Sequence, residues 1–117
     1  MKIISDHAHG ILDYATVFIF ASAPYLLGLT GVAMLASYAL AGIHLAMTLF
    51  TNMPPGLIKV VPMKLHSFVE LCVGPVLIIG ALAFPGLVGG ARLFFALMGA
   101  VIFLVWSFSH YGQTNHV

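Results

Sequence analysis

The sequence has very little charge. Only 6% of its 117 residues are Asp, Glu, Lys or Arg, whereas a soluble domain carries about 25% charged residues. A soluble chain of this length needs a polar surface to stay dispersed, but a bilayer accepts apolar side chains on every outward face. The composition therefore predicts a membrane protein, and the length predicts one domain that spans residues 1–117.

Several common chemistries have no basis in this sequence. The formal net charge is +1 with neutral histidines, so no basic stripe exists for nucleic acid. Cys72 is the only cysteine, which excludes an internal disulfide and a zinc or iron–sulfur site built from several cysteines of one chain. The chain has no glycine-rich phosphate loop, nucleophile elbow or His-Glu-x-x-His motif. The sequence thus identifies no catalytic residue and does not favour an enzyme.

Four long apolar stretches dominate the chain. They cover approximately residues 8–28, 32–52, 64–84 and 91–111, and each has about the 20 residues that a helix needs to cross hydrocarbon. Short segments rich in Gly and Pro, residues 28–31 and 85–90, separate the first pair and the last pair. The sequence predicts an all-α, four-helix transmembrane bundle made of two tandem hairpins, about 8–52 and 64–111. The proline-containing segment 52–62 is expected to hold a short amphipathic stretch at the membrane surface.

The few basic residues indicate an orientation. Lys2, Lys59 and Lys64 fall on the side shared by the amino terminus and the central loop, whereas the opposite side carries only Arg92. The positive-inside rule then predicts that both termini are cytoplasmic.

Two pairs of short segments suggest an internal repeat. Residues 9–13 (HGILD) are echoed by residues 66–70 (HSFVE), and residues 39–42 (ALAG) by residues 96–99 (ALMG), at the same spacing. The first hairpin returns to its starting side, so the two copies would be parallel repeats about an axis along the membrane normal. Small residues on the second and fourth helices, including Gly42 and Gly99, are expected to permit close helix packing.

Ionisable residues gather on the cytoplasmic side of the predicted bundle. His9 and Asp13 are four residues apart, as are His66 and Glu70, so each pair shares one face of a helix. A charged residue near the centre of a membrane helix costs about 2.5 to 3.5 kcal/mol, so its presence there needs a structural or functional explanation. The remaining members expected on this side are His44 on the second helix and His110 at the end of the fourth, and Tyr14 is close enough to donate to the acid pair.

Three interpretations of this cluster stay open. The histidine–acid pairs can form structural hydrogen bonds that hold the helices of the bundle together. They can hold a transition metal such as zinc, iron or manganese through His9, Asp13, His44, His66 and Glu70. A variant of this second interpretation is haem ligation by His44 with His9 or His66, which requires a slot between helices. The third interpretation is a proton relay or a site for a small polar ligand.

The chain also resembles a known family. Residues 9–14 (HGILDY), residues 23–28 (APYLLG) and the copy that begins at His66 are similar to small bacterial membrane proteins of the SPW-repeat type. The Ser-Pro-Trp that names that family is replaced by residues 23–25 (APY) and 84–86 (FPG). The resemblance implies a four-helix protein with two tandem hairpins in the bacterial inner membrane. It implies no activity and no cofactor.

The predicted function follows from the apolar faces and the short loops. Such a chain offers little soluble surface, so we expect an accessory or scaffolding subunit that packs against other membrane helices or against copies of itself within the lipid bilayer. The first alternative is a metal- or haem-binding membrane protein that uses the cytoplasmic-side cluster. The second alternative is a small oligomeric transporter or proton relay, although the outer half of the helices has no charged residue to continue a polar path.

Overall fold

The computed structural model describes residues 3–109 and confirms the all-α class. Its helices are α1 (Asp6–Leu27), α2 (Gly31–Phe50), α3 (Met63–Ala83) and α4 (Gly89–Phe108). Each helix begins one to two residues before the predicted stretch. The fourth ends earlier than expected, at Phe108, because Ser109 already has extended backbone angles. His110 lies outside the described residues.

The ends of α1 follow the local sequence. The side chain of Ser5 accepts a hydrogen bond from the backbone N–H of Ala8, which caps the first turn. Gly28 ends the helix with a φ of 66°, a left-handed conformation that glycine adopts at little cost. The chain can then turn within three residues into α2, as a tight hairpin requires.

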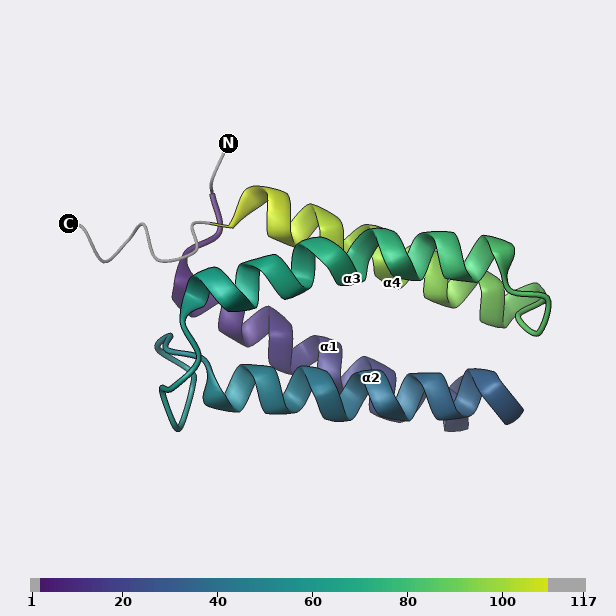
Figure 1. Cartoon of the computed structure of the whole chain (residues 1–117). Coiled ribbons are helices and arrows are strands. Elements are labelled where there is room, and N and C mark those ends of the chain that lie inside the picture. The colour runs from purple at the N-terminus through teal and green to yellow at the C-terminus, as the bar shows by residue number, and fades with distance from the viewer. Residues whose placement is uncertain (1–2, 110–117) are drawn as a thin grey trace.

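The helices pack as two hairpins, α1 along α2 and α3 along α4 (Figure 1). Between the hairpins, the ring of Phe20 in α1 lies 5.7 Å from that of Phe94 and 6.4 Å from that of Phe95, both in α4. The amino-terminal segment, the central loop and the end of α4 all lie at one end of the bundle, whereas the ribbons of α2 and α3 diverge toward the other end. Whether the hairpins are copies of one ancestral unit stays a prediction.

Gly74 and Gly99 permit close packing of α3 and α4, whereas Gly42 of α2 faces open space. A Cβ atom added at Gly99 would lie 2.7 Å from the carbonyl oxygen of Gly74, and one added at Gly74 would lie 3.1 Å from Cβ of Phe103. The expected role of Gly99 in helix packing is therefore confirmed. A Cβ at Gly42 would meet nothing within 4 Å, so the same expectation for Gly42 is wrong within residues 3–109.

The central segment, residues 51–62, is an irregular loop folded against α1. This segment is not helical, and a position of its amphipathic stretch at the membrane surface stays a prediction. The hydroxyl of Tyr14 donates to the carbonyl of Pro55 (2.8 Å) rather than to the acid pair, and a Cβ on Gly10 would overlap the Pro55 ring. The Met53 side chain is buried. The loop therefore covers this end of the bundle.

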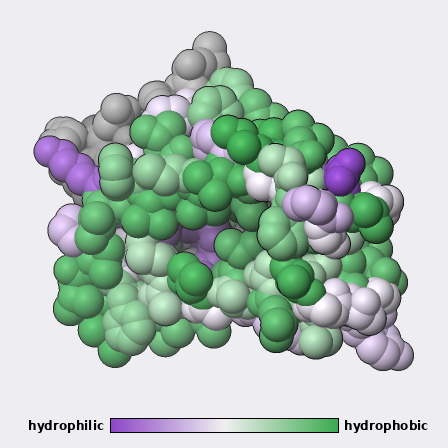
Figure 2. Space-filling model, turned by 45° about the vertical axis from the view of Figure 1, so that its right-hand side comes forward, coloured by the Kyte–Doolittle hydropathy of each residue, from purple (hydrophilic) through white to green (hydrophobic). Residues whose placement is uncertain are grey.

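The outer surface is apolar, as Figure 2 shows. All four helices are long and apolar enough to cross a membrane, with mean hydropathies between 1.4 and 2.0. Large apolar side chains such as Phe18, Tyr25 and Leu26 are highly exposed, which would be unfavourable in water and is favourable in lipid. These properties fit an integral membrane protein, while the bacterial inner membrane and the cytoplasmic termini stay predictions.

A buried histidine–carboxylate cluster

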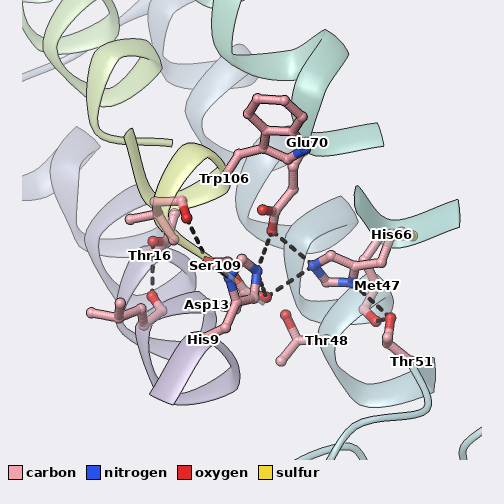
Figure 3. Close-up of polar contacts among 12 residues, drawn as sticks. His9, Asp13, Thr16, Met47, Thr48, Thr51, His66, Glu70, Trp106 and Ser109 are labelled. Atoms are coloured by element: carbon pink, nitrogen blue, oxygen red, sulfur yellow. Dashed lines mark hydrogen bonds and ion pairs between the residues drawn. The ribbon is translucent and has the colours of Figure 1, made fainter. Parts of the chain in front are cut away.

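The structure brings together the five residues that the sequence singled out as metal or cofactor ligands. His9 and Asp13 come from α1, His44 from α2, and His66 and Glu70 from α3. All five are buried, and His44 is the most exposed at 9%. They lie at the end of the bundle where the central loop begins and α4 ends (Figures 1 and 3). We refer to these five residues as the cluster.

Both carboxylates contact the same two imidazole rings. Oε1 of Glu70 lies 2.7 Å from Nε2 of His66 and 3.0 Å from Nε2 of His9. Oδ2 of Asp13 lies 3.0 Å from Nε2 of His66 and 3.3 Å from Nε2 of His9. The rings of His9 and His66 meet edge to face, with centroids 5.5 Å apart. The Nε2 atoms from two different hairpins are therefore directed at one shared pair of carboxylates (Figure 3).

The opposite ring nitrogens are held by hydroxyl groups that the sequence interpretation did not include. Nδ1 of His9 lies 2.7 Å from Oγ of Ser109, and Nδ1 of His66 lies 2.8 Å from Oγ1 of Thr51. Both hydroxyls donate their hydrogen to a carbonyl one turn earlier in the chain, Ser109 to Val105 and Thr51 to Met47. No signal in the sequence could reveal these contacts, because they join segments 100 and 15 residues apart.

These hydroxyls determine where the imidazole protons are. A hydroxyl has one hydrogen, and here it is already donated to a backbone carbonyl, so the oxygen can only accept from the ring. We therefore assign a proton to Nδ1 in both His9 and His66. In the metal-free cluster Nε2 of each ring also carries a hydrogen, because it faces carboxylate oxygens that only accept, at 2.7 to 3.3 Å. A bound metal ion would take the place of that hydrogen. Metal-bound histidines commonly have their second nitrogen fixed by a partner in this way.

One carboxylate oxygen has ion-pair neighbours but no properly oriented hydrogen bond. Within the described chain, Oδ2 of Asp13 is buried and accepts none, although two Nε2 atoms lie within 3.3 Å of it. A buried oxygen of this kind is costly unless it is satisfied by a hydrogen bond or an ion. Within the described chain, Oδ2 of Asp13 is therefore the buried oxygen that has room for a further polar partner.

His44 belongs to the cluster but sits at its edge. Its Nε2 lies 3.4 Å from Oδ1 of Asp13 and 4.0 Å from Oε1 of Glu70, which are longer separations than those of the other two histidines. The four remaining residues each offer one ligand atom, and these atoms all lie within 4.8 Å of one another. His44 is thus a neighbour of the four-residue set.

Backbone and loop contacts separate the cluster from water at its end of the bundle. The N–H of Ile4 donates to the carbonyl of Phe108 (2.8 Å), which ties the start of the chain to the end of α4. Thr51 and Ser109 are buried, and the central loop packs on α1 through Pro55. The cluster is therefore an interior site.

The ligand spacing suits one small ion better than a porphyrin. In a tetrahedral site with bonds of about 2.0 to 2.1 Å, neighbouring ligand atoms are about 3.3 to 3.4 Å apart. The four nitrogen–oxygen separations are between 2.7 and 3.3 Å, so slight expansion would admit an ion. The carboxylate of Asp13 contacts His9, His44 and His66, so a haem between any two of these rings would require the cluster to separate.

Comparisons with protein-family models, with curated proteins and with solved structures gave no match. The resemblance to the SPW-repeat type therefore stays a prediction. The fold and the site define a class by themselves, a four-helix membrane bundle with a buried histidine–carboxylate cluster between its two hairpins.

Proposed function

We propose that this protein binds one divalent transition-metal ion inside the membrane, through His9, Asp13, His66 and Glu70. One observation carries the proposal. Two imidazole Nε2 atoms and two carboxylates converge on a common point, while Ser109 and Thr51 hold the Nδ1 atoms in the tautomer that metal binding needs.

The charge balance of the site supports a divalent ion. Two ionised carboxylates in an apolar interior are costly unless positive charge offsets them, which two imidazolium rings do in the metal-free cluster and one divalent cation would do in the metal-bound one. A divalent cation bound by two carboxylates and two neutral imidazoles forms a neutral unit. Nitrogen and oxygen ligands in this ratio suit zinc, iron or manganese.

The arrangement of the ligands also suggests what the ion does. His9 and Asp13 belong to the α1–α2 hairpin, and His66 and Glu70 belong to the α3–α4 hairpin. An ion bound by all four residues would join the two hairpins. Because the four protein ligands complete a tetrahedral set, the site is of the kind that stabilises a fold.

Metal analysis of the purified protein tests the proposal. The chain is loaded with zinc in detergent, freed of excess metal, and measured for zinc per chain and for thermal stability. We expect about one zinc per chain and a higher melting temperature. His9→Gln should lose both effects. His7→Gln is the matched control, because His7 is exposed and two residues away in the same helix.

Equal zinc content in His9→Gln and His7→Gln would contradict the proposal, as would zinc-free protein with an unchanged melting temperature. The cluster would then be a set of imidazolium–carboxylate ion pairs that joins the hairpins directly. The role as an accessory subunit stays a prediction, which the exposed apolar faces support without naming a partner. The transporter alternative also stays a prediction.

A further inference from the structure

His44 has a nitrogen that nothing in the described chain satisfies. Its Nε2 faces the carboxylates of Asp13 and Glu70, but its Nδ1 makes no hydrogen bond within residues 3–109. The residue as a whole is 9% exposed, and Asp13 Oδ2 is the one fully buried polar side-chain atom without a hydrogen bond among the described residues, so Nδ1 of His44 is partly accessible at the surface of the bundle. The contrast with His9 and His66 is clear, since a hydroxyl holds Nδ1 in each of those rings.

The neighbours of His44 determine what its free nitrogen can bind. Ionised carboxylates are acceptors only, so the Nε2 that faces Asp13 carries a hydrogen. A hydroxyl group can donate a hydrogen bond to Nδ1 or accept one from it, whereas a carbonyl or ether oxygen can only accept. A hydroxyl is therefore a suitable partner for Nδ1 whichever hydrogens the ring carries.

A small pocket lies between α2 and α3 at this position. It is lined by His44, His66 and Glu70 together with apolar side chains from both helices, and its volume is about 20 Å³. A pocket needs a volume of about 10 to 15 Å³, measured in the same way, to hold a water-sized group. The pocket therefore accommodates a single hydroxyl and excludes the head group of a phospholipid.

A larger apolar groove begins one helical turn farther along the same two helices. Its volume is about 230 Å³, and its wall includes Ala36 of α2 and Leu77 and Gly80 of α3. Leu40 and Val73 line the small pocket, each four residues from a groove residue on its own helix. Figure 2 shows an opening in the apolar surface with hydrophilic atoms at its base. The site is thus reached from the side, through the membrane.

We propose that this groove binds a neutral, membrane-soluble molecule with a hydroxyl head, which forms a hydrogen bond with Nδ1 of His44. Among the described residues, neither Lys nor Arg lines the pocket or the groove, so an anionic head would have no counter-ion and would face Asp13 and Glu70. The apolar groove would hold the body of the molecule. This inference goes beyond metal binding and depends on a different part of the cluster.

Photolabelling of the intact chain in phosphatidylcholine nanodiscs tests the inference. The first probe is a 4-alkylphenol with a diazirine in its chain, and the second is the same molecule without the hydroxyl. We expect the phenol to label residues of the α2–α3 groove about fivefold more than the second probe does, which is the effect of one hydrogen bond. Equal labelling by both probes, or phenol label spread evenly over all lipid-facing helices, would overturn the inference.

Two glycine substitutions separate the groove from general lipid contact. A Cβ at Gly80 or at Gly42 meets nothing within 4 Å, but only Gly80 lines the groove. Gly80→Leu should fill the groove and remove the preferential labelling, whereas Gly42→Leu should keep it. His44→Phe should reduce phenol labelling to the level of the second probe. Gly80→Leu and Gly42→Leu should both keep their zinc, so a failure of metal binding and a failure of this inference are read from separate measurements.

Discussion

Nδ1 of His66 donates a hydrogen bond to Oγ1 of Thr51, with 2.8 Å between the two atoms. Thr51 directly follows the last residue of α2, and His66 lies in the first turn of α3. The contact therefore spans the central loop and aligns the ring whose Nε2 is closest to Glu70.

Removing this hydroxyl should weaken metal binding without removing a ligand. Thr51→Val keeps the shape of the side chain but leaves Nδ1–H of His66 without its acceptor. We expect zinc affinity to fall about 10- to 100-fold. Competition with a chelator of known affinity measures the change. Ser22→Ala is the control, because Ser22 makes the same kind of backbone contact, to the carbonyl of Phe18, farther along α1 and away from the cluster. If both variants lower zinc affinity equally, the Thr51 hydroxyl does not position the ring of His66.

Metal affinity should fall as the pH falls. A proton and a metal ion compete for Nε2 of His9 and of His66, so acid displaces the metal and alkali does not. We expect zinc retention on the wild-type chain to decrease between pH 7 and pH 5, measured after equilibrium dialysis. The melting temperature of the zinc-loaded protein should decrease in the same interval. Zinc retention that is independent of pH would indicate that neither imidazole is a ligand.

The sequence was sufficient to predict the four helices and the residues of the cluster, for a physical reason. Length and apolarity specify a membrane helix, and four-residue spacing places His9 with Asp13 on one face of α1. The loop and helix ends that cover the cluster were not predictable. They depend on Pro55 packing against Gly10 and on Ser109 leaving α4, and each of these is a contact between distant segments.

The cover of the cluster can be tested at Gly10. A Cβ at this position would overlap the side chain of Pro55, whose ring cannot rotate away. Gly10→Ala should displace the central loop and expose Met53, which is 2% exposed. We expect the loop to open about tenfold more often, equivalent to about 1.4 kcal/mol.

The rate at which peroxide oxidises Met53 measures this opening by mass spectrometry. Gly90→Ala is the control, because a Cβ at Gly90 in α4 meets nothing within 4 Å. If Met53 in Gly10→Ala is oxidised as slowly as in the control, the loop does not depend on the contact with α1.

Close packing of α3 on α4 depends on the absence of side chains at two facing positions. Gly99→Leu would place atoms where the carbonyl of Gly74 and the side chain of Ile78 now lie. We expect the free energy of unfolding to fall by about 1 to 3 kcal/mol, as overpacking does. Unfolding in mixed micelles with increasing denaturing detergent measures the loss. Gly42→Leu should change stability by less than about 0.5 kcal/mol, because its site is open. Similar losses in both variants would exclude a special contact at Gly99.

The placement of the helices in lipid can be tested with the native cysteine. Cys72 is exposed on the surface of α3, near the middle of the helix. In a bilayer, lipid rather than water should cover it, and a thiol in apolar surroundings does not readily form the reactive thiolate. A charged maleimide should therefore label Cys72 only after the membrane is dissolved in denaturing detergent. Rapid labelling in intact membranes would contradict a membrane-spanning α3.

The same chemistry reports the orientation when cysteines are placed at both ends of α3. In a Cys72→Ala background, Leu57→Cys lies in the central loop and Val88→Cys lies beyond the opposite end of α3, and both positions are highly exposed. If the termini are cytoplasmic, the charged maleimide should label Val88→Cys in intact cells. It should label Leu57→Cys only in permeabilised cells. The reverse pattern would place the central loop and the cluster on the outer side, so that a metal ion would enter from outside the cell.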